Sequence, residues 1–198
     1  MDKKPYTREE KKQKISEHFS EIMKVLWLDL NDESLKDTPK RVAKMYVDEI
    51  FYWLDESNFP KIMTVNNGEN QTVKYDQILL ERNIQINSYC EHHFQNIIWK
   101  AHIAYIPSKK VIWLSKLNRI ADFYARRPQV QERLTEQIFW KLVEELWTDD
   151  VAVIIEAEHF CVKVRGVEDP CSDTVTSRLW GRFLQPEARK ELFDLISL

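Results

Sequence analysis

Cysteine and histidine, residues of the kinds that bind metal ions, cluster in two short segments of the sequence. Cys90 and His93 are three residues apart in "CEHH", and His159 and Cys161 are two residues apart in "EHFC". Thiolate and imidazole ligands suit zinc, and three protein ligands with one open position are typical of a catalytic zinc site. A single residue of either kind is more often a buried thiol or a surface histidine. Because the clustering occurs twice in a chain with only 3 cysteines and 5 histidines, the sequence predicts a metal site.

The second pair lies in "VAVIIEAEHFCVKVRGV", which is rich in β-branched residues and is predicted to be a strand. Side chains two and four residues apart in a strand share a face, so His159, Cys161 and Arg165 would project together. A basic residue beside a metal favours an anionic substrate. An arginine on an exposed edge strand is equally common, and both interpretations of Arg165 stay open here.

Two further groups of polar residues are candidates for substrate binding. Ser115, Lys116 and Arg119 fall at the start of a predicted helix, where backbone N–H groups and cations favour an anion. A solvated basic face is an equally good explanation. Gln131 and Glu132 follow a proline break, and an adjacent amide and carboxylate could bind the donor edge of a purine. Such a pair on a helix usually faces solvent.

The periodicity of the chain predicts an α+β fold. Thr7 to Glu10 forms a possible capping box at the start of one helix, and a second helix begins near Asp37 or Thr38. Ser115 is predicted to cap a later helix that runs through Arg127. The order is helix–helix, strand–strand, helix–helix, strand–strand, helix, which favours an antiparallel sheet with helices on one face. The predicted strands are in "NIQIN", "IIWKAHIAYIP", a short returning "VIW", "VAVIIEAEHFCVKVRGV" and "TVTSRLWGRF".

The composition narrows the class of protein. With 198 residues, 43% apolar and 31% charged, the chain is typical of a globular protein with one domain and a small helical lobe. Its net charge of -3 argues against general nucleic-acid binding. The start "MDKKPYTREEKKQK" does not resemble a signal peptide, and no apolar run is long enough to span a membrane. Three sparse cysteines predict reduced thiols in the cytoplasm.

Several motifs, in this order, resemble the GTP cyclohydrolase I family, from about Phe19 to the C-terminus. They are "DTPKRVAKMYVDEIF", "CEHHF", "HIAYIP", "LSKLNRIADFYARRPQVQERLT", "EHFCVKVRG" and "TVTS". The resemblance implies zinc-dependent hydrolysis and ring rearrangement of GTP to 7,8-dihydroneopterin triphosphate and formate. This reaction is the first step of tetrahydrofolate-type pterin biosynthesis.

The resemblance also implies a role for each matching residue. Zinc ligands match Cys90, His93 and Cys161, and Glu91 matches a residue that orients a ligand. The acid–base histidines match His92 and His159, with His92 and Ser115 assisting the later ribose rearrangement. Gln131 and Glu132 match the pair that holds the guanine edge. Contacts to the ribose and triphosphate match Lys44, Ser115, Lys116, Arg119 and Arg165.

The fold that the resemblance implies is the tunnelling fold, with a four-stranded antiparallel sheet and two long helices on one face. The N-terminal helical region would cover residues 1–60 and the catalytic domain residues 61–198. Subunits would form a pentameric barrel, two barrels would stack as a homodecamer, and the active site would lie between subunits. No nucleic acid or membrane partner is implied. The alternatives are a related deazaguanine reductase with a cysteine nucleophile, and an inactive homologue that keeps zinc and assembly.

Six tryptophans occur where members of this family commonly have glycine, in a chain with only 3 glycines. Trp147 precedes "TDD" at a predicted helix end, where a left-handed cap favours glycine. Trp113 comes two residues before Ser115, where an indole could crowd a phosphate site. We predict that the gene has UGA codons read as glycine at these positions; the alternative is a lineage repacked around aromatic residues. The six are Trp27, Trp53, Trp99, Trp113, Trp147 and Trp180.

Overall fold

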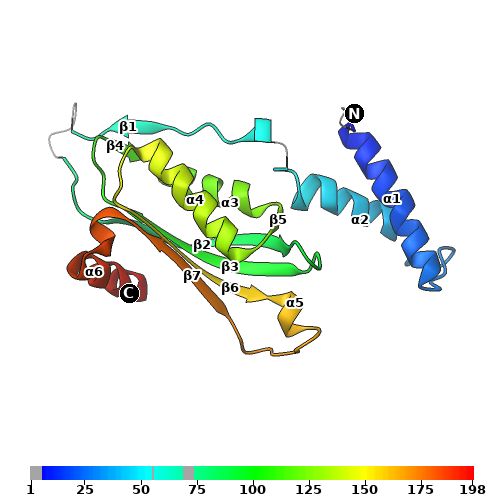
Figure 1. Ribbon diagram of the computed structural model, residues 1–198. Helices are drawn as coiled ribbons and strands as arrows, with labels where there is room; N and C mark the ends of the chain where they lie inside the picture. Colours follow the sequence, from blue (N-terminus) through cyan, green and yellow to red (C-terminus); the bar gives the residue numbers. More distant parts are fainter. Residues whose placement is uncertain (1–5, 55, 69–73) are drawn as a thin grey trace, which may run out of the picture. The chain divides into compact units, whose positions relative to one another are not determined.

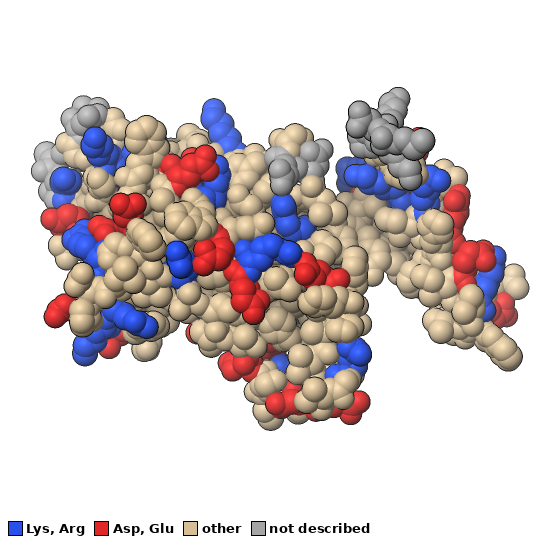
Figure 2. Space-filling view, in the orientation of Figure 1, with Lys and Arg blue, Asp and Glu red and all other residues tan. Residues whose placement is uncertain are grey.

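The computed structural model describes residues 6–54, 56–68 and 74–198 of the chain. These residues belong to two compact units, Met1–Asp55 and Glu56–Leu198. The sequence placed the corresponding boundary between residues 60 and 61. Among the described residues, every helix is too short or too polar to cross a lipid bilayer. On the face drawn in Figure 2, lysine and arginine side chains are interspersed with aspartate and glutamate.

The N-terminal unit is helical, as predicted. It consists of α1 (Arg8–Val25), α2 (Thr38–Lys44) and a π-helical turn, Met45–Ile50. The capping box at the start of α1 is present: Thr7 Oγ1 accepts a bond from the Glu10 backbone N–H, and Glu10 Oε2 accepts one from the Thr7 N–H. These bonds pair N–H groups that a helix start otherwise leaves without partners. The local sequence was therefore sufficient to place the first residue of α1.

The second unit is built on a mixed sheet of five strands in the order β5-β2-β3-β6-β7 (Figure 1). All pairs are antiparallel except the short parallel pair of β2 and β5. The hairpins β2–β3 and β6–β7 correspond to the two predicted strand pairs. The strands are β2 (Leu79–Cys90), β3 (Asn96–Tyr105), β5 (Pro128–Gln129), β6 (Val151–His159) and β7 (Thr174–Leu179).

One predicted strand pairs differently from the expectation. The segment "VIW" contributes to β4 (Lys110–Ile112), which pairs with β1 (Thr64–Asn66) in a separate two-stranded sheet. It does not return along β3, because β2 and β6 already occupy both edges of that strand.

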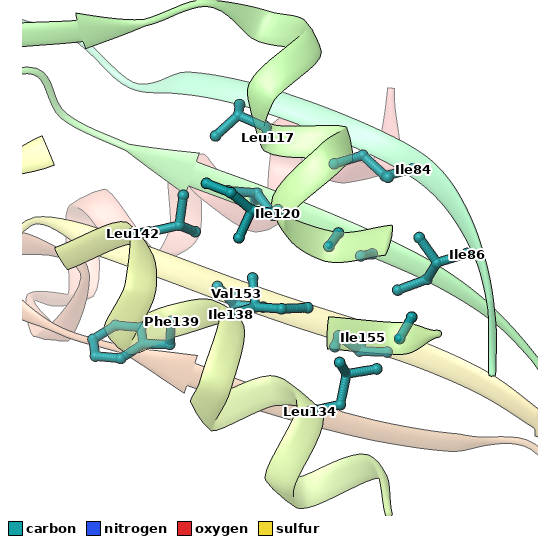
Figure 3. Packing of buried hydrophobic residues seen from close by; sticks show 14 of the residues in the cluster. Ile84, Ile86, Leu117, Ile120, Leu134, Ile138, Phe139, Leu142, Val153 and Ile155 are labelled. Atoms are coloured by element: carbon teal, nitrogen blue, oxygen red, sulfur yellow. The ribbon is translucent and has the colours of Figure 1, made fainter. Parts of the chain in front are cut away.

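Two helices, α3 (Leu114–Ala125) and α4 (Gln131–Leu146), cover one face of the large sheet (Figure 1). Their apolar stripes bury residues such as Leu117 and Ile138 against Ile86 and Val153 of the sheet (Figure 3). The expectation of helices on one face holds for these two long helices but not for the C-terminal one. The C-terminal helix α6 (Pro186–Ser197) packs on the opposite face, where Leu192 joins a second cluster. The middle strands β3 and β6 are buried on both faces over part of their length, so both faces need cover.

Two boundaries near the candidate site also differ from the prediction. Strand β6 ends at His159, and the next residues form a short helix, α5 (Phe160–Lys163), in which the Val164 N–H donates to Phe160 O. The predicted strand through Arg165 is therefore wrong, because the last ladder pair joins His159 to Ile97. Helix α3 starts two residues earlier than predicted, with Trp113 as its N-cap, so Ser115 lies in its first turn instead of capping it.

Trp27 adopts a left-handed backbone conformation, with φ of 63°. It follows Leu26, the C-cap residue of α1. Its N–H donates to Lys24 O at 2.9 Å, and the N–H of Leu28 donates to Met23 O at 3.0 Å. These two bonds define a Schellman motif, in which the left-handed residue is usually glycine.

Trp147 ends α4 in the same way, with φ of 54° and its N–H bonded to Val143 O. Both indoles are mostly exposed, 94% for Trp27 and 71% for Trp147, so little burial offsets the strain of a left-handed backbone. The other tryptophans of the set are not among the residues with positive φ. They are Trp53, Trp99, Trp113 and Trp180.

Candidate metal centre

The turn between β2 and β3 brings a cysteine and a histidine together. Cys90 is the last residue of β2; its N–H donates to Gln95 O, and its carbonyl accepts from the Phe94 N–H at 2.8 Å. Phe94 closes the turn with φ of 52°. Cys90 Sγ consequently lies 3.8 Å from Nδ1 of His93 and 3.9 Å from Nδ1 of His92.

Helix α5 supplies a third donor atom. The ligand atoms of Cys90, His93 and Cys161 all lie within 4.8 Å of one another. Tetrahedral zinc with a thiolate and an imidazole ligand separates sulfur and nitrogen by about 3.6 Å. The 3.8 Å between Cys90 Sγ and His93 Nδ1 is close to that value, and two thiols with one imidazole are a zinc-type donor set. The donor set and the Cys90–His93 separation therefore fit a zinc ion.

The surroundings of Cys161 explain why a cation would be stabilising there. Burial raises the pKa of the Cys161 thiol, and the adjacent Cys90 raises it further, while the charge of Arg165 acts in the opposite direction. Two neighbouring thiols resist becoming thiolates together, because each negative charge disfavours the other. A bound divalent cation removes that conflict.

His159 lies at the end of β6, half-buried, with its ring centroid 5.9 Å from that of Trp99. Burial lowers the pKa of His159, and the nearby carboxylate of Glu132 raises it. Nε2 of His159 lies 2.8 Å from Oε1 of Gln131, the first residue of α4. The histidine is therefore held beside the Cys–His–Cys cluster by helix α4.

Glu91 is linked to helix α4 by an arginine that the sequence analysis did not identify. Arg133 forms an ion pair with Glu91, and it also donates from Nε to Gln129 Oε1 and from Nη2 to Pro128 O. The Glu91 N–H donates to Gln129 O at 3.1 Å. Glu91 and Arg133 are 42 residues apart, and no local pattern in the sequence indicates their contact.

The predicted phosphate-binding residues lie elsewhere in the same unit. Ser115 and Lys116 are in the first turn of α3, and Arg119 lines a cavity of about 450 Å³ together with Asp122 and the β2 residues from 81 to 85. Ser115 and Arg119 are exposed, whereas Lys116 is buried.

Strand β2 separates this cavity from the metal cluster. Ile84, which lines the cavity, is six residues before Cys90 on that strand, a separation of about 20 Å. Lys44 is exposed at the end of α2 in the N-terminal unit. The structure thus brings together the predicted metal ligands and four other candidate site residues, which are His159, Gln131, Glu132 and Arg165. It leaves Ser115, Lys116 and Arg119 apart from them.

A zinc-type Cys–His–Cys cluster beside a half-buried histidine, on an α+β fold, defines a candidate metal-dependent enzyme. The family model described as GTP cyclohydrolase I matches residues 15–197, and the chain belongs to that family, as the sequence motifs predicted.

Curated relatives agree with the family assignment. A "GTP cyclohydrolase 1" of Photobacterium profundum is 52% identical over 98% of this chain and 88% of the relative. One of Aeromonas salmonicida is 54% identical over 92% of this chain and 83% of the relative. One of Flavobacterium johnsoniae is 50% identical over 97% of this chain and 84% of the relative.

Proposed function

We propose that this chain converts GTP to 7,8-dihydroneopterin triphosphate and formate with zinc held by Cys90, His93 and Cys161. The observation that carries the proposal is the convergence of three donor atoms within 4.8 Å in a chain of the GTP cyclohydrolase I family. Nothing in the comparisons favours an inactive homologue, and relatives at about half identity argue against a reductase.

The side chains around the cluster have the chemistry that the reaction requires. Zinc, when bound, acts as a Lewis acid and makes water a nucleophile near neutral pH. When its ring is protonated, His159 can donate a proton to a guanine ring nitrogen beside the carbon that water attacks, since an imidazole gives and takes protons near neutral pH. The carboxylate of Glu132 can accept hydrogen bonds from the guanine N–H groups. Arg165 contributes positive charge for the anionic nucleotide.

The phosphate-binding residues fit this proposal if a second copy of the chain supplies them. Strand β2 has no partner at its outer edge before Tyr89, and β7 forms the opposite edge of the large sheet, in the part of the chain described. Two such edges allow head-to-tail pairing of subunits into a closed ring. We propose a homodecamer of two stacked pentamers in the cytoplasm, in which the α3 start of one subunit, with Ser115, Lys116 and Arg119, reaches the metal cluster of its neighbour. Lys44 would add a further phosphate contact.

Turnover of GTP with and without zinc tests the proposed function. The zinc-loaded protein should release formate and form a fluorescent pterin, and removing zinc with a chelator should abolish both until zinc is restored. His159→Ala should retain stoichiometric zinc and lose turnover by ~10²-fold or more, the usual scale of acid–base catalysis. Loss of zinc in that variant would make His159 a ligand. A zinc-loaded wild-type protein that leaves GTP unchanged would refute the function.

A further inference from the structure

The side-chain amide of Gln131 is already committed within the protein. Gln131 is 2% exposed. Its Nε2 donates to the backbone carbonyls of Ile155 at 3.0 Å and Thr174 at 2.9 Å. Its Oε1 lies 2.8 Å from Nε2 of His159. An amide nitrogen has two hydrogens to donate, so both donors of Gln131 are used.

These contacts fix which way the amide faces. Carbonyl oxygens only accept hydrogen bonds, so the NH₂ group must face Ile155 and Thr174, and the oxygen must face His159. Because Oε1 can only accept, the hydrogen in the contact belongs to Nε2 of His159. In the neutral ring, Nδ1 is then the nitrogen with the free lone pair. The orientation of one amide therefore determines the tautomer of the histidine.

The position of Gln131 is fixed by three elements of the fold. It is the first residue of α4, while its two acceptors belong to β6 and to the start of β7. One turn further along α4, Thr135 Oγ1 donates to Gln131 O and lies 2.8 Å from Thr176 Oγ1 of β7. Helix α4 is thereby bonded to β7 at Gln131 and again one turn further along, at Thr135.

We propose that Gln131 is a positioning residue, which orients His159 and holds it as the Nε2–H tautomer, and that its side chain does not bind guanine. The inference rests on the proposed catalytic function of His159. The exposed carboxylate of Glu132 then remains as the side chain of this pair that can bind the guanine edge.

The test is a double-mutant cycle with Gln131→Met and His159→Ala. Methionine has nearly the length of glutamine but makes none of its three hydrogen bonds. Gln131→Met alone should lower kcat by ~10²-fold, the cost of a misplaced catalytic group, with zinc retained and GTP affinity within twofold of wild type. In the His159→Ala background the same substitution should lower kcat no further. A large rise in KM at unchanged kcat, or full additivity in the cycle, would overturn the proposal.

Thr135→Val is the matched control, since it removes the neighbouring contact between α4 and β7 and leaves the bond to His159 intact. It should keep near wild-type kcat; a loss equal to that of Gln131→Met would mean that both residues act only by holding α4 in place.

The tautomer can be measured by NMR, independently of enzymatic activity. In ¹⁵N-labelled, zinc-loaded protein, the ring-nitrogen chemical shifts of His159 should indicate the Nε2–H form in wild type and a mixture of tautomers in Gln131→Met. The opposite tautomer in wild type would refute the inference even if GTP were turned over. The expected tautomer in an inactive wild type would instead refute the proposed function and leave the contact standing.

Discussion

The metal cluster and the start of α3 contrast in how their side chains are held. At the metal cluster, residues from a β-turn, a strand end and two helices converge, and hydrogen bonds fix Gln131, His159 and Arg133. At the start of α3, Ser115 and Arg119 lie one turn apart on a single helix and are exposed. The first group is organised by the fold of one chain. In the second group, Arg119 lines a cavity beside the edge of β2 that has no strand partner among the described residues.

The contrast shows which part of the proposed site a single chain can form. All three metal ligands come from one chain, whose fold brings their ligand atoms within 4.8 Å of one another. A phosphate-binding helix start needs only to be presented at a surface, where a neighbouring subunit can complete the site. The following substitutions test the two regions separately.

Cys161→Ala should abolish both zinc binding and turnover. It removes one of the three donor atoms, and a Cys–His pair alone is a weak site. Zinc content by elemental analysis and GTP turnover on the same sample are the measurements. Cys171→Ser is the control, because Cys171 is exposed and outside the cluster. Stoichiometric zinc in Cys161→Ala would show that the cluster is not the metal site.

Arg119→Ala should weaken GTP binding by ~10- to 100-fold, the effect of losing a charge-assisted hydrogen bond, and leave zinc content unchanged. Binding is measured by calorimetry on a His159→Ala background, where GTP is turned over slowly. Arg126→Ala, at the C-cap of the same helix and paired with Asp122, serves as the control. Equal loss of affinity in both variants would mean that Arg119 contributes only general positive charge.

Arg133→Met should speed the release of zinc to a chelator by ~10-fold, because residues that orient metal ligands typically change affinity on this scale. Glu91→Gln should have a similar effect, and the double variant should be little faster than either single variant, since the two residues form one bridge. Lys141→Met, also on α4 but paired with Glu144 and Glu145, should leave the rate unchanged. Additive effects would show that Glu91 and Arg133 act independently.

Trp27→Gly and Trp147→Gly should each stabilise the protein by ~1 kcal/mol, because glycine adopts a left-handed backbone without strain. Trp113→Gly is the control: Trp113 has φ of -66°, so no such gain is expected there. The free energy of unfolding of the three variants is measured by urea denaturation. Separately, peptide mass spectrometry of the native protein should show glycine at the six tryptophan positions if the codons are UGA. Tryptophan in those peptides would end that hypothesis.

Local patterns in the sequence were enough to predict some features of the structure and not others. The capping box at Thr7 depends on neighbouring residues, and the metal ligands stand out because cysteine and histidine are rare in this chain. The end of β6 at His159 could not be predicted, since it depends on where β3 ceases to be a partner. The hydrogen bonds of Gln131 could not be predicted either, because its acceptors are backbone carbonyls 24 and 43 residues away.

If the metal cluster of one subunit works with the α3 start of another, as we propose, two differently impaired chains should complement each other in a mixed assembly. His159→Ala and Arg119→Ala chains are co-expressed in equal amounts and purified as mixed assemblies. In a ring of randomly mixed subunits, about one site in four combines an intact metal cluster with an intact neighbouring α3 start. At GTP concentrations well below saturation, where each variant alone should keep about a tenth of wild-type turnover or less, the mixed assemblies should therefore reach about a quarter of it. Turnover no higher than the mean of the two separate variants would show that each chain uses its own Arg119, contradicting the account.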